Sequence, residues 1–184
     1  EAARSIGLPT VFGSEVTVQS ADTTHNLVIL ADGQPGYARL SQALSLAQLA
    51  GSKGDPRCTL EDLSDSASGH WWVLTGCQQG VVPATLMQLG PNAALRELQR
   101  LVAAFGRDRV LVELWNHGDP LDSARNDALV ELAARCEVSC VATNNVSYAV
   151  PSQHRLATAM AAVRNRCDLN EIDHLLPPAA TAYL

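Results

Sequence analysis

No apolar run in this sequence approaches the roughly 18–20 residues that a helix needs to cross a bilayer. The N-terminal stretch EAARSIGLPT also lacks the charged-then-apolar layout of a signal peptide. Within these residues the sequence therefore indicates neither a membrane-spanning helix nor a signal peptide. Because that stretch has no initiator Met and resembles the end of a helix, we expect the chain to begin inside a longer protein.

Paired cysteines are a second absence. The sequence contains no CxxC pair, and its five cysteines are an odd number: Cys58, Cys77, Cys136, Cys140 and Cys167. A disulfide framework or a zinc ribbon needs paired, closely spaced cysteines. We therefore expect reduced thiols and a cytoplasmic protein.

Positive charge is also scarce. The formal net charge is −6 and the pI is near 5.2, which argues against a segment that grips a phosphate backbone by itself. Basic residues gather locally at Arg155, Arg164 and Arg166, in a stretch with a helical pattern. They can form a solvated helix face or contact phosphates, and we favour the solvated face.

The segments that remain alternate between strand and helix patterns, as in α/β proteins. Short apolar, β-branched runs predict strands at 10–18, 26–31, 70–76, 109–115 and 139–144. Helical spacing predicts helices at 35–51, 59–63, 91–106, 119–136 and 151–167, with Thr59 as an N-cap. Because the strands are almost continuously apolar, we expect parallel strands joined by crossover helices, in an incomplete barrel or a wound sheet.

In parallel α/β folds the loops at the carboxyl ends of the strands converge on one face. Polar residues follow the predicted strands at these positions: Glu15, Cys77, Asn116, His117, Asn144, Asn145 and Ser147. A carboxylate, a thiol, a histidine and several amides at equivalent positions can form a small polar site or a metal site.

Each of these residues also has a purely structural interpretation. Glu15 can be a surface charge, and Cys77 a small buried apolar residue. His117 can be a loop residue near the start of the next helix, with Asp119 as the N-cap. Residues 144–145 suit the left-handed turns in which asparagine is common. No P-loop, GxSxG, HExxH or Rossmann fingerprint decides between the interpretations.

Six segments in order resemble a known family: LPTVFGSEVTV, NLVILADGQPGYARLS, VLTGC, FGRDRVLVELWNHGDPLDSARNDALVELA, VATNNVSYA and RLATAMAAVRNRCDLNEIDHLLPPAATAYL. Together they are similar to the PHP (polymerase and histidinol phosphatase) domain of bacterial C-family DNA polymerases. RNDALVELA, VATNNV and RLATAMAAVRNR resemble the error-prone, damage-inducible branch more closely. The resemblance implies a distorted parallel (βα)7 barrel, incomplete at its N-terminal side, with residues 1–184 forming most of one PHP domain.

Metal-binding members of this family hold up to three divalent ions, and the resemblance assigns their ligand positions here. Glu15 and Cys77 match ligands, whereas Asn26, Asn145 and Ser147 stand where the family has histidine, aspartate and histidine. An amide has no negative charge for a hard cation, and a serine offers no imidazole. We therefore expect a vestigial, empty site. His25 does not restore it, because a shift of one residue turns a strand side chain to the opposite face.

The resemblance implies that the chain belongs to an error-prone polymerase III alpha-type subunit, a DNA-directed DNA polymerase for translesion synthesis in DNA repair and replication. It would act in the SOS response, on DNA and deoxynucleotides, with accessory polymerase subunits as further expected partners and without a membrane. The Mg²⁺ ions and catalytic residues would lie in a downstream domain, so this segment would hold no catalytic residue and no cofactor. The alternatives are a metal-dependent PHP phosphoesterase, a 3′–5′ exonuclease, and an interaction module without a polymerase.

Overall fold

The computed structural model describes residues 2–20, 23–169, 171 and 180–183. Residues 172–179, which belong to the last segment of the family resemblance, therefore lie outside the described part. Five strands form one sheet: β1 (Gly13–Ser20), β2 (Thr23–Ala31), β3 (Trp71–Leu74), β4 (Val110–Leu114) and β5 (Ser139–Ala142). The α/β class predicted from the sequence is confirmed.

The helices follow the predicted alternation. Their bounds are α1 (Ala2–Ser5), α2 (Gly33–Ala50), α3 (Leu60–Ala67), α4 (Val81–Leu89), α5 (Pro91–Phe105), η1 (Arg107–Arg109), α6 (Asp122–Cys136), η2 (Pro151–Gln153) and α7 (His154–Asn165). Sequence patterns missed α4, whose stretch VVPATLMQL is apolar on most sides and lacks an amphipathic period. None of the described helices is long and apolar enough to cross a membrane.

The sheet is mixed, which corrects the expectation of parallel strands throughout. The strands lie in the order β1-β2-β3-β4-β5; β1 and β2 pair antiparallel, as do β2 and β3, whereas β3, β4 and β5 are parallel. The register of β1 and β2 runs to Ser20 opposite Thr23, so only two residues join the strands. A connection this short permits an antiparallel hairpin but no crossover. Among the described residues the sheet is open and does not close into a barrel.

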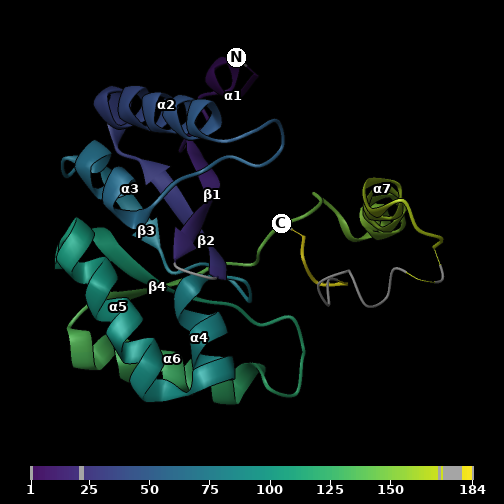
Figure 1. The fold of residues 1–184 in the computed structure, drawn as a ribbon. Coiled ribbons are helices and arrows are strands. Elements are labelled where there is room, and N and C mark those ends of the chain that lie inside the picture. Colours follow the sequence, from purple (N-terminus) through teal and green to yellow (C-terminus); the bar gives the residue numbers. More distant parts are fainter. Residues whose placement is uncertain (1, 21–22, 170, 172–179, 184) are drawn as a thin grey trace.

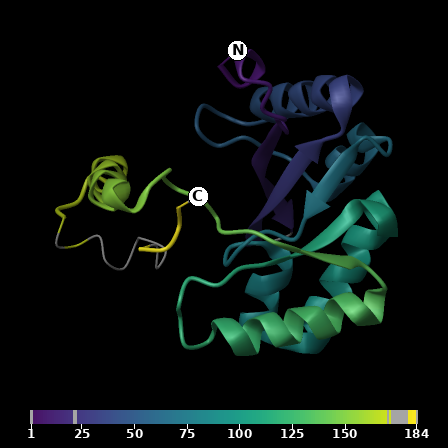
Figure 2. The same cartoon turned by 180° about the vertical axis from the view of Figure 1, so that it is seen from behind.

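One face of the sheet builds the hydrophobic core. Leu27, Ile29, Val73 and Val112 are almost fully buried there, in one cluster with side chains from α2, α3, α5 and α6 such as Leu98. Figures 1 and 2 show these helices stacked beside the sheet. Successive strand residues point to opposite faces of the sheet. The sequence neighbours of these core residues, including Asn26 and Glu113, therefore project from the other face.

Local capping fixes where α3 begins. The Thr59 hydroxyl accepts a hydrogen bond from the Asp62 backbone N–H at 3.2 Å, and the Asp62 carboxylate accepts one from the Thr59 N–H at 2.9 Å. This capping box confirms Thr59 as the predicted N-cap. The reciprocal bonds lower the pKa of Asp62, mainly through the Thr59 backbone N–H.

Thr59→Ala should lower the free energy of unfolding by about 1 kcal/mol, because α3 loses the side-chain acceptor of its capping box. Urea unfolding followed by circular dichroism measures this loss. The matched control is Ser41→Ala, at an exposed position inside α2, where the free energy should stay within about 0.5 kcal/mol of wild type. Equal effects of the two variants would contradict the role of the cap.

Candidate functional site

The candidate site lies where the carboxyl ends of β3, β4 and β5 meet the amino end of β2. Gly76 adopts a φ of +81°, and a Cβ there would lie 2.7 Å from the Gly80 Cα. This tight turn returns the loop to β2, where the Asn26 N–H donates to the Gln79 carbonyl at 3.1 Å. The close approach requires glycine and brings Cys77, inside the turn, near the sheet edge.

Glu15 and Asn26 form a direct pair. The Asn26 amide Nδ2 donates to the Glu15 Oε1 at 2.7 Å, and its Oδ1 accepts from the Thr17 hydroxyl at 3.2 Å. Glu15 lies inside β1 opposite Val28, which corrects the expectation that it follows a strand. The pairing is possible because β1 runs antiparallel to β2 and places Glu15 on the same face as Asn26. The amide thus engages one of the two Glu15 carboxylate oxygens.

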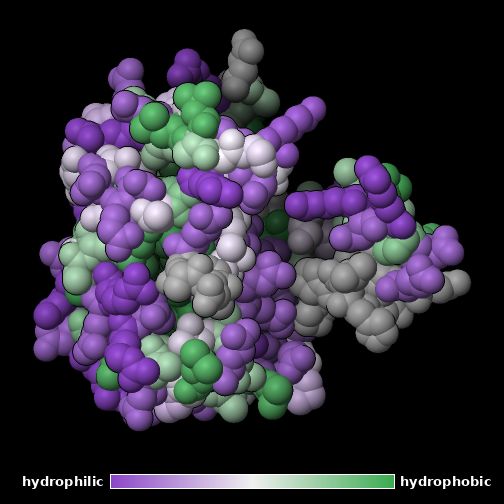
Figure 3. All heavy atoms as spheres, viewed as in Figure 1, coloured by the Kyte–Doolittle hydropathy of each residue, from purple (hydrophilic) through white to green (hydrophobic). Residues whose placement is uncertain are grey.

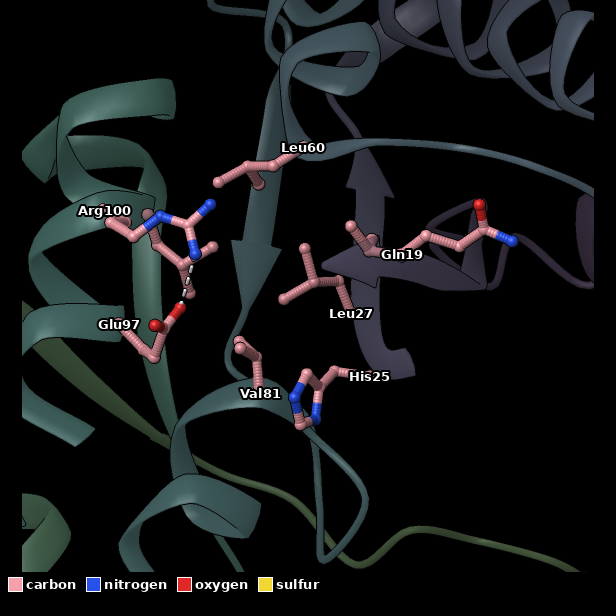
Figure 4. Close-up of a pocket in the computed structure, with 9 residues that line it drawn as sticks. Gln19, His25, Leu27, Leu60, Val81, Glu97 and Arg100 are labelled. Carbon is pink, nitrogen blue, oxygen red and sulfur yellow. Dashed lines mark hydrogen bonds and ion pairs between the residues drawn. The ribbon is translucent and has the colours of Figure 1, made fainter. Parts of the chain in front are cut away.

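His25 lies on the opposite face of β2, as predicted. It lines a cavity of about 30 Å³ together with Val18, Leu27 and other side chains from the helix side of the sheet. Figure 4 shows His25 there beside Val81, with the Glu97–Arg100 ion pair of α5 on the other side of the cavity. His25 is next to Asn26 in the sequence, but neighbouring strand residues point to opposite faces. His25 therefore does not lie on the face of the sheet that carries Glu15 and Asn26.

Cys77 is partly buried and packs against the core, in line with its structural interpretation. Burial raises the pKa of its thiol, hydrogen bonding to the Gln79 backbone opposes this, and the negative charges of Glu113 and Glu15 raise it further. Since the thiolate is the form that binds metal, a raised pKa weakens Cys77 as a ligand.

Glu113 is a residue of the site that sequence reasoning missed. It is buried in β4, and its Oε1 accepts a hydrogen bond from the Thr143 hydroxyl at 2.5 Å. Its Oε2 has no hydrogen-bond partner among the residues that the structure describes. Burial raises the pKa of Glu113, the Thr143 hydrogen bond lowers it, and the Glu15 charge raises it again. A carboxylate within the apolar run VLVELW was the available signal, because charged residues are rarely buried.

Asn145 and Ser147 lie in the exposed loop after β5. Asn145 has a φ of +43°, which confirms the left-handed turn predicted for residues 144–145. The Ser147 hydroxyl is 3.5 Å from the Asn145 carbonyl, and its backbone N–H donates to Ala182 at 2.9 Å. Among the described residues, no hydrogen bond joins this loop to Glu15 or Cys77. The structure thus brings Glu15 and Asn26 into direct contact.

Neighbouring loop residues have structural roles. The Asn144 amide donates to the carbonyls of Thr181 and Tyr183 at 2.6 and 2.7 Å. His117 is buried, and its Nε2 lies 2.9 Å from the Asn144 carbonyl. Asp119 does not cap α6: its carboxylate accepts from the Leu121 N–H in the turn before that helix. Asn116 accepts from the Gly118 N–H in the same loop.

The described residues do not fit the metals that the family can hold. They contain no group of three or more His, Cys, Asp or Glu side chains that could bind one ion. Asn26 donates to one of the two Glu15 oxygens, and the pKa of the Cys77 thiol is raised. A divalent ion needs several charged or imidazole ligands to activate water, so no catalytic step can be assigned to this site.

Comparison with known proteins identifies the family of this chain. The family model described as PHP domain matches residues 1–117. This chain belongs to the PHP domain family. Over its whole length it is 44% identical to the error-prone DNA polymerase of Mycolicibacterium paratuberculosis, 45% to that of Mycobacterium tuberculosis strain H37Rv and 44% to that of Cutibacterium acnes. The PHP chain spans only 17–18% of the length of these relatives.

A solved structure also resembles the PHP chain, at a low level. It is a Bifidobacterium adolescentis protein whose description names a metal-dependent phosphoesterase, with 14% sequence identity and a TM-score of 0.49. The likeness covers 78% of the PHP chain and 70% of the other. We draw no conclusion about function from a similarity this weak.

Asn26→Asp should destabilise the fold by up to about 1 kcal/mol at neutral pH, because two carboxylates would then face each other across β1 and β2. Urea unfolding of Asn26→Asp, Glu15→Gln and the double variant forms a thermodynamic cycle. In the double variant most of the loss should be recovered. Strictly additive effects would show that the two side chains do not interact in solution.

Glu113→Gln should stabilise the fold increasingly as the pH rises above the ordinary glutamate value of about 4.3. The folded state raises the pKa of Glu113, so wild type loses stability between the ordinary value and the raised value, while the neutral amide does not. At pH 8 we expect a melting temperature higher by about 2–4 °C, the shift that about 1 kcal/mol gives in a domain of this size.

Thermal unfolding at several pH values measures the difference between wild type and Glu113→Gln. The control is Glu131→Gln, which removes an exposed carboxylate of α6. If the melting temperatures of wild type and Glu113→Gln differ by the same amount at pH 4 and at pH 8, the pKa of Glu113 is not raised in the folded state.

Proposed function

We propose that this chain is the PHP portion of an error-prone, polymerase III alpha-type DNA polymerase and that its own role is structural. The observation that carries the proposal is the 44–45% identity over the whole chain to error-prone DNA polymerases. The full-length polymerase that contains this chain, called the parent below, would copy DNA past damaged bases by nucleotidyl transfer. It would act in repair and replication and within the SOS response. Its substrates would be DNA and deoxynucleotides, and accessory subunits would be its partners.

The residues of the candidate site support a structural role. Asn26 satisfies Glu15 with a hydrogen bond, and Asn144 holds the loop after β5 against residues 181–183. The Asn26 amide thus joins β1 to β2, and the Asn144 amide fixes the loop after β5, both by hydrogen bonding. In this proposal Glu15 and Cys77 are vestigial ligands, Asn26, Asn145 and Ser147 are former ligand positions, and Mg²⁺ acts in the polymerase domain of the parent.

The cysteines support a reducing, cytoplasmic location for the parent. All five are free thiols. Cys58 and Cys136 are buried, and burial raises the pKa of Cys58 to about 11, with the charge of Asp62 adding to the effect. Such thiols are inert apolar core residues, and they suit a compartment in which disulfides do not form.

The full-length parent should extend a primer past a damaged template base when Mg²⁺ is added, while holding no stoichiometric transition metal after gel filtration. Primer extension and elemental mass spectrometry on one preparation measure both properties. The matched variant is Cys77→Ala, which should leave nucleotide incorporation and metal content unchanged because the thiol binds nothing.

Two results would contradict the proposal in different ways. A parent that incorporates no nucleotides under any template condition would remove the polymerase assignment. Tightly bound zinc, manganese or iron that is lost in Cys77→Ala would show a working metal site, and the phosphoesterase or exonuclease function would then replace the structural role.

A further inference from the structure

Helix α7 exposes a stripe of large apolar side chains. Leu156 is 58% exposed, Met160 66% and Val163 78%. Their spacing of four and three residues places all three on one side of the helix. On another side Ala162 is buried, and the Thr158 hydroxyl donates to the His154 carbonyl at 2.9 Å. The helix therefore uses its small residues for packing and leaves its largest apolar residues uncovered.

Positive charge borders this stripe on both sides. At about 100° per residue, Arg155 and Arg164 lie on opposite flanks of the line through Leu156, Met160 and Val163, and both arginines are exposed. Helix α7 contains no Asp or Glu, although the chain as a whole carries a net charge of −6. The stripe is thus an apolar surface with cationic borders in an otherwise acidic protein.

Helix α7 lies away from the sheet. Figures 1 and 2 both show α7 standing apart from the other helices, and Figure 3 shows apolar and polar side chains next to each other on this lobe. The segments on either side are tied together, because Ser147 donates to Ala182 and Tyr148 stacks on Tyr183 with ring centroids 6.4 Å apart. These contacts close the base of the lobe that carries α7.

We propose that the Leu156–Met160–Val163 stripe docks onto another part of the full-length polymerase, outside these 184 residues. The contacting segment has an apolar ridge bordered by carboxylates that pair with Arg155 and Arg164. This inference rests on the proposed function. The curated relatives devote more than four fifths of their length to sequence outside the match, and a covalently linked segment binds at high effective concentration.

Other occupants fit the surface less well. A nucleic acid backbone is charged throughout and offers no apolar surface to cover three large side chains. An anionic membrane would meet a chain with a net charge of −6. A protein surface with apolar and acidic residues can cover the apolar stripe and also pair with the arginines on its borders.

Methionine oxidation in the full-length polymerase tests the docking directly. The chain has two methionines, Met160 in the stripe and Met87 on α4, with similar exposures of 66% and 58%. Dilute hydrogen peroxide followed by peptide mass spectrometry gives the oxidation rate of each, relative to its own rate in urea. We expect Met160 to be protected at least about tenfold, since a docked state favoured ten to one leaves about a tenth of the molecules open.

Variants separate docking from general protection. The double variant Leu156→Glu/Val163→Glu should return Met160 to its rate in the open state, because it places charges in the apolar contact. Leu49→Glu, at an 82% exposed position on α2, is the matched control and should leave Met160 protected. Arg155→Glu/Arg164→Glu should also release Met160, because acidic borders would then repel the helix.

Specific results would overturn the inference. An unprotected Met160 in wild type would show that the stripe is open. Protection that falls on dilution would assign the cover to a second molecule, and protection that needs added DNA or lipid vesicles would assign it to them. Release by the glutamates in the stripe but not by the arginine changes would overturn the acidic borders. Primer extension on the same preparation tests the proposed function separately, because it does not depend on the state of Met160.

Discussion

The buried carboxylate of Asp122 holds together the part of the fold on which the candidate site depends. It accepts hydrogen bonds from the backbone N–H groups of His117 and Asp119 at 2.7 and 3.0 Å and pairs with Arg125 at 2.7 Å. Burial opposes its ionisation, but these partners lower the pKa of Asp122 overall. Removing one member of such a buried pair leaves an uncompensated charge, so the arrangement tolerates little change.

The effect of Asp122 extends to the loops at the strand ends. Arg125 donates to the Trp115 carbonyl at 3.0 Å, and its guanidinium carbon lies 3.8 Å from the centroid of the Trp115 ring. These contacts fix the end of β4 against α6. His117, held by Asp122, contacts the Asn144 carbonyl, and Asn144 binds residues 181 and 183. A single anchored turn thus connects the end of the sheet with the lobe that carries α7.

The sequence predicts the elements well because their signals are local. Thr59 correctly predicts the start of α3. The apolar run at 26–31 lies within β2, and the run at 109–115 contains β4. The predicted strand direction was wrong for β1 and β2. The direction of these strands depends on the two-residue connection and on pairing between distant residues. Helix α4 escaped detection because burial on most sides removes the helical period from its sequence.

The candidate site was predictable in part for the same reason. The alternation of a strand placed His25 and Asn26 on opposite faces, and the structure confirms this. The Asn26–Glu15 bond could not be predicted, since it requires the antiparallel register of β1 and β2. Glu113 was missed because its position in an apolar strand indicates burial, whereas its proximity to Glu15 depends on tertiary structure.

The clasp between residues 147–148 and 182–183 makes the α7 lobe a self-contained insertion. Both of its ends are fastened at one place, by the Ser147–Ala182 hydrogen bond and the bridge between Tyr148 and Tyr183. Since the cost of closing a loop rises only slowly with its length, a lobe fastened at its two ends is closed at little more cost than a shorter one would be.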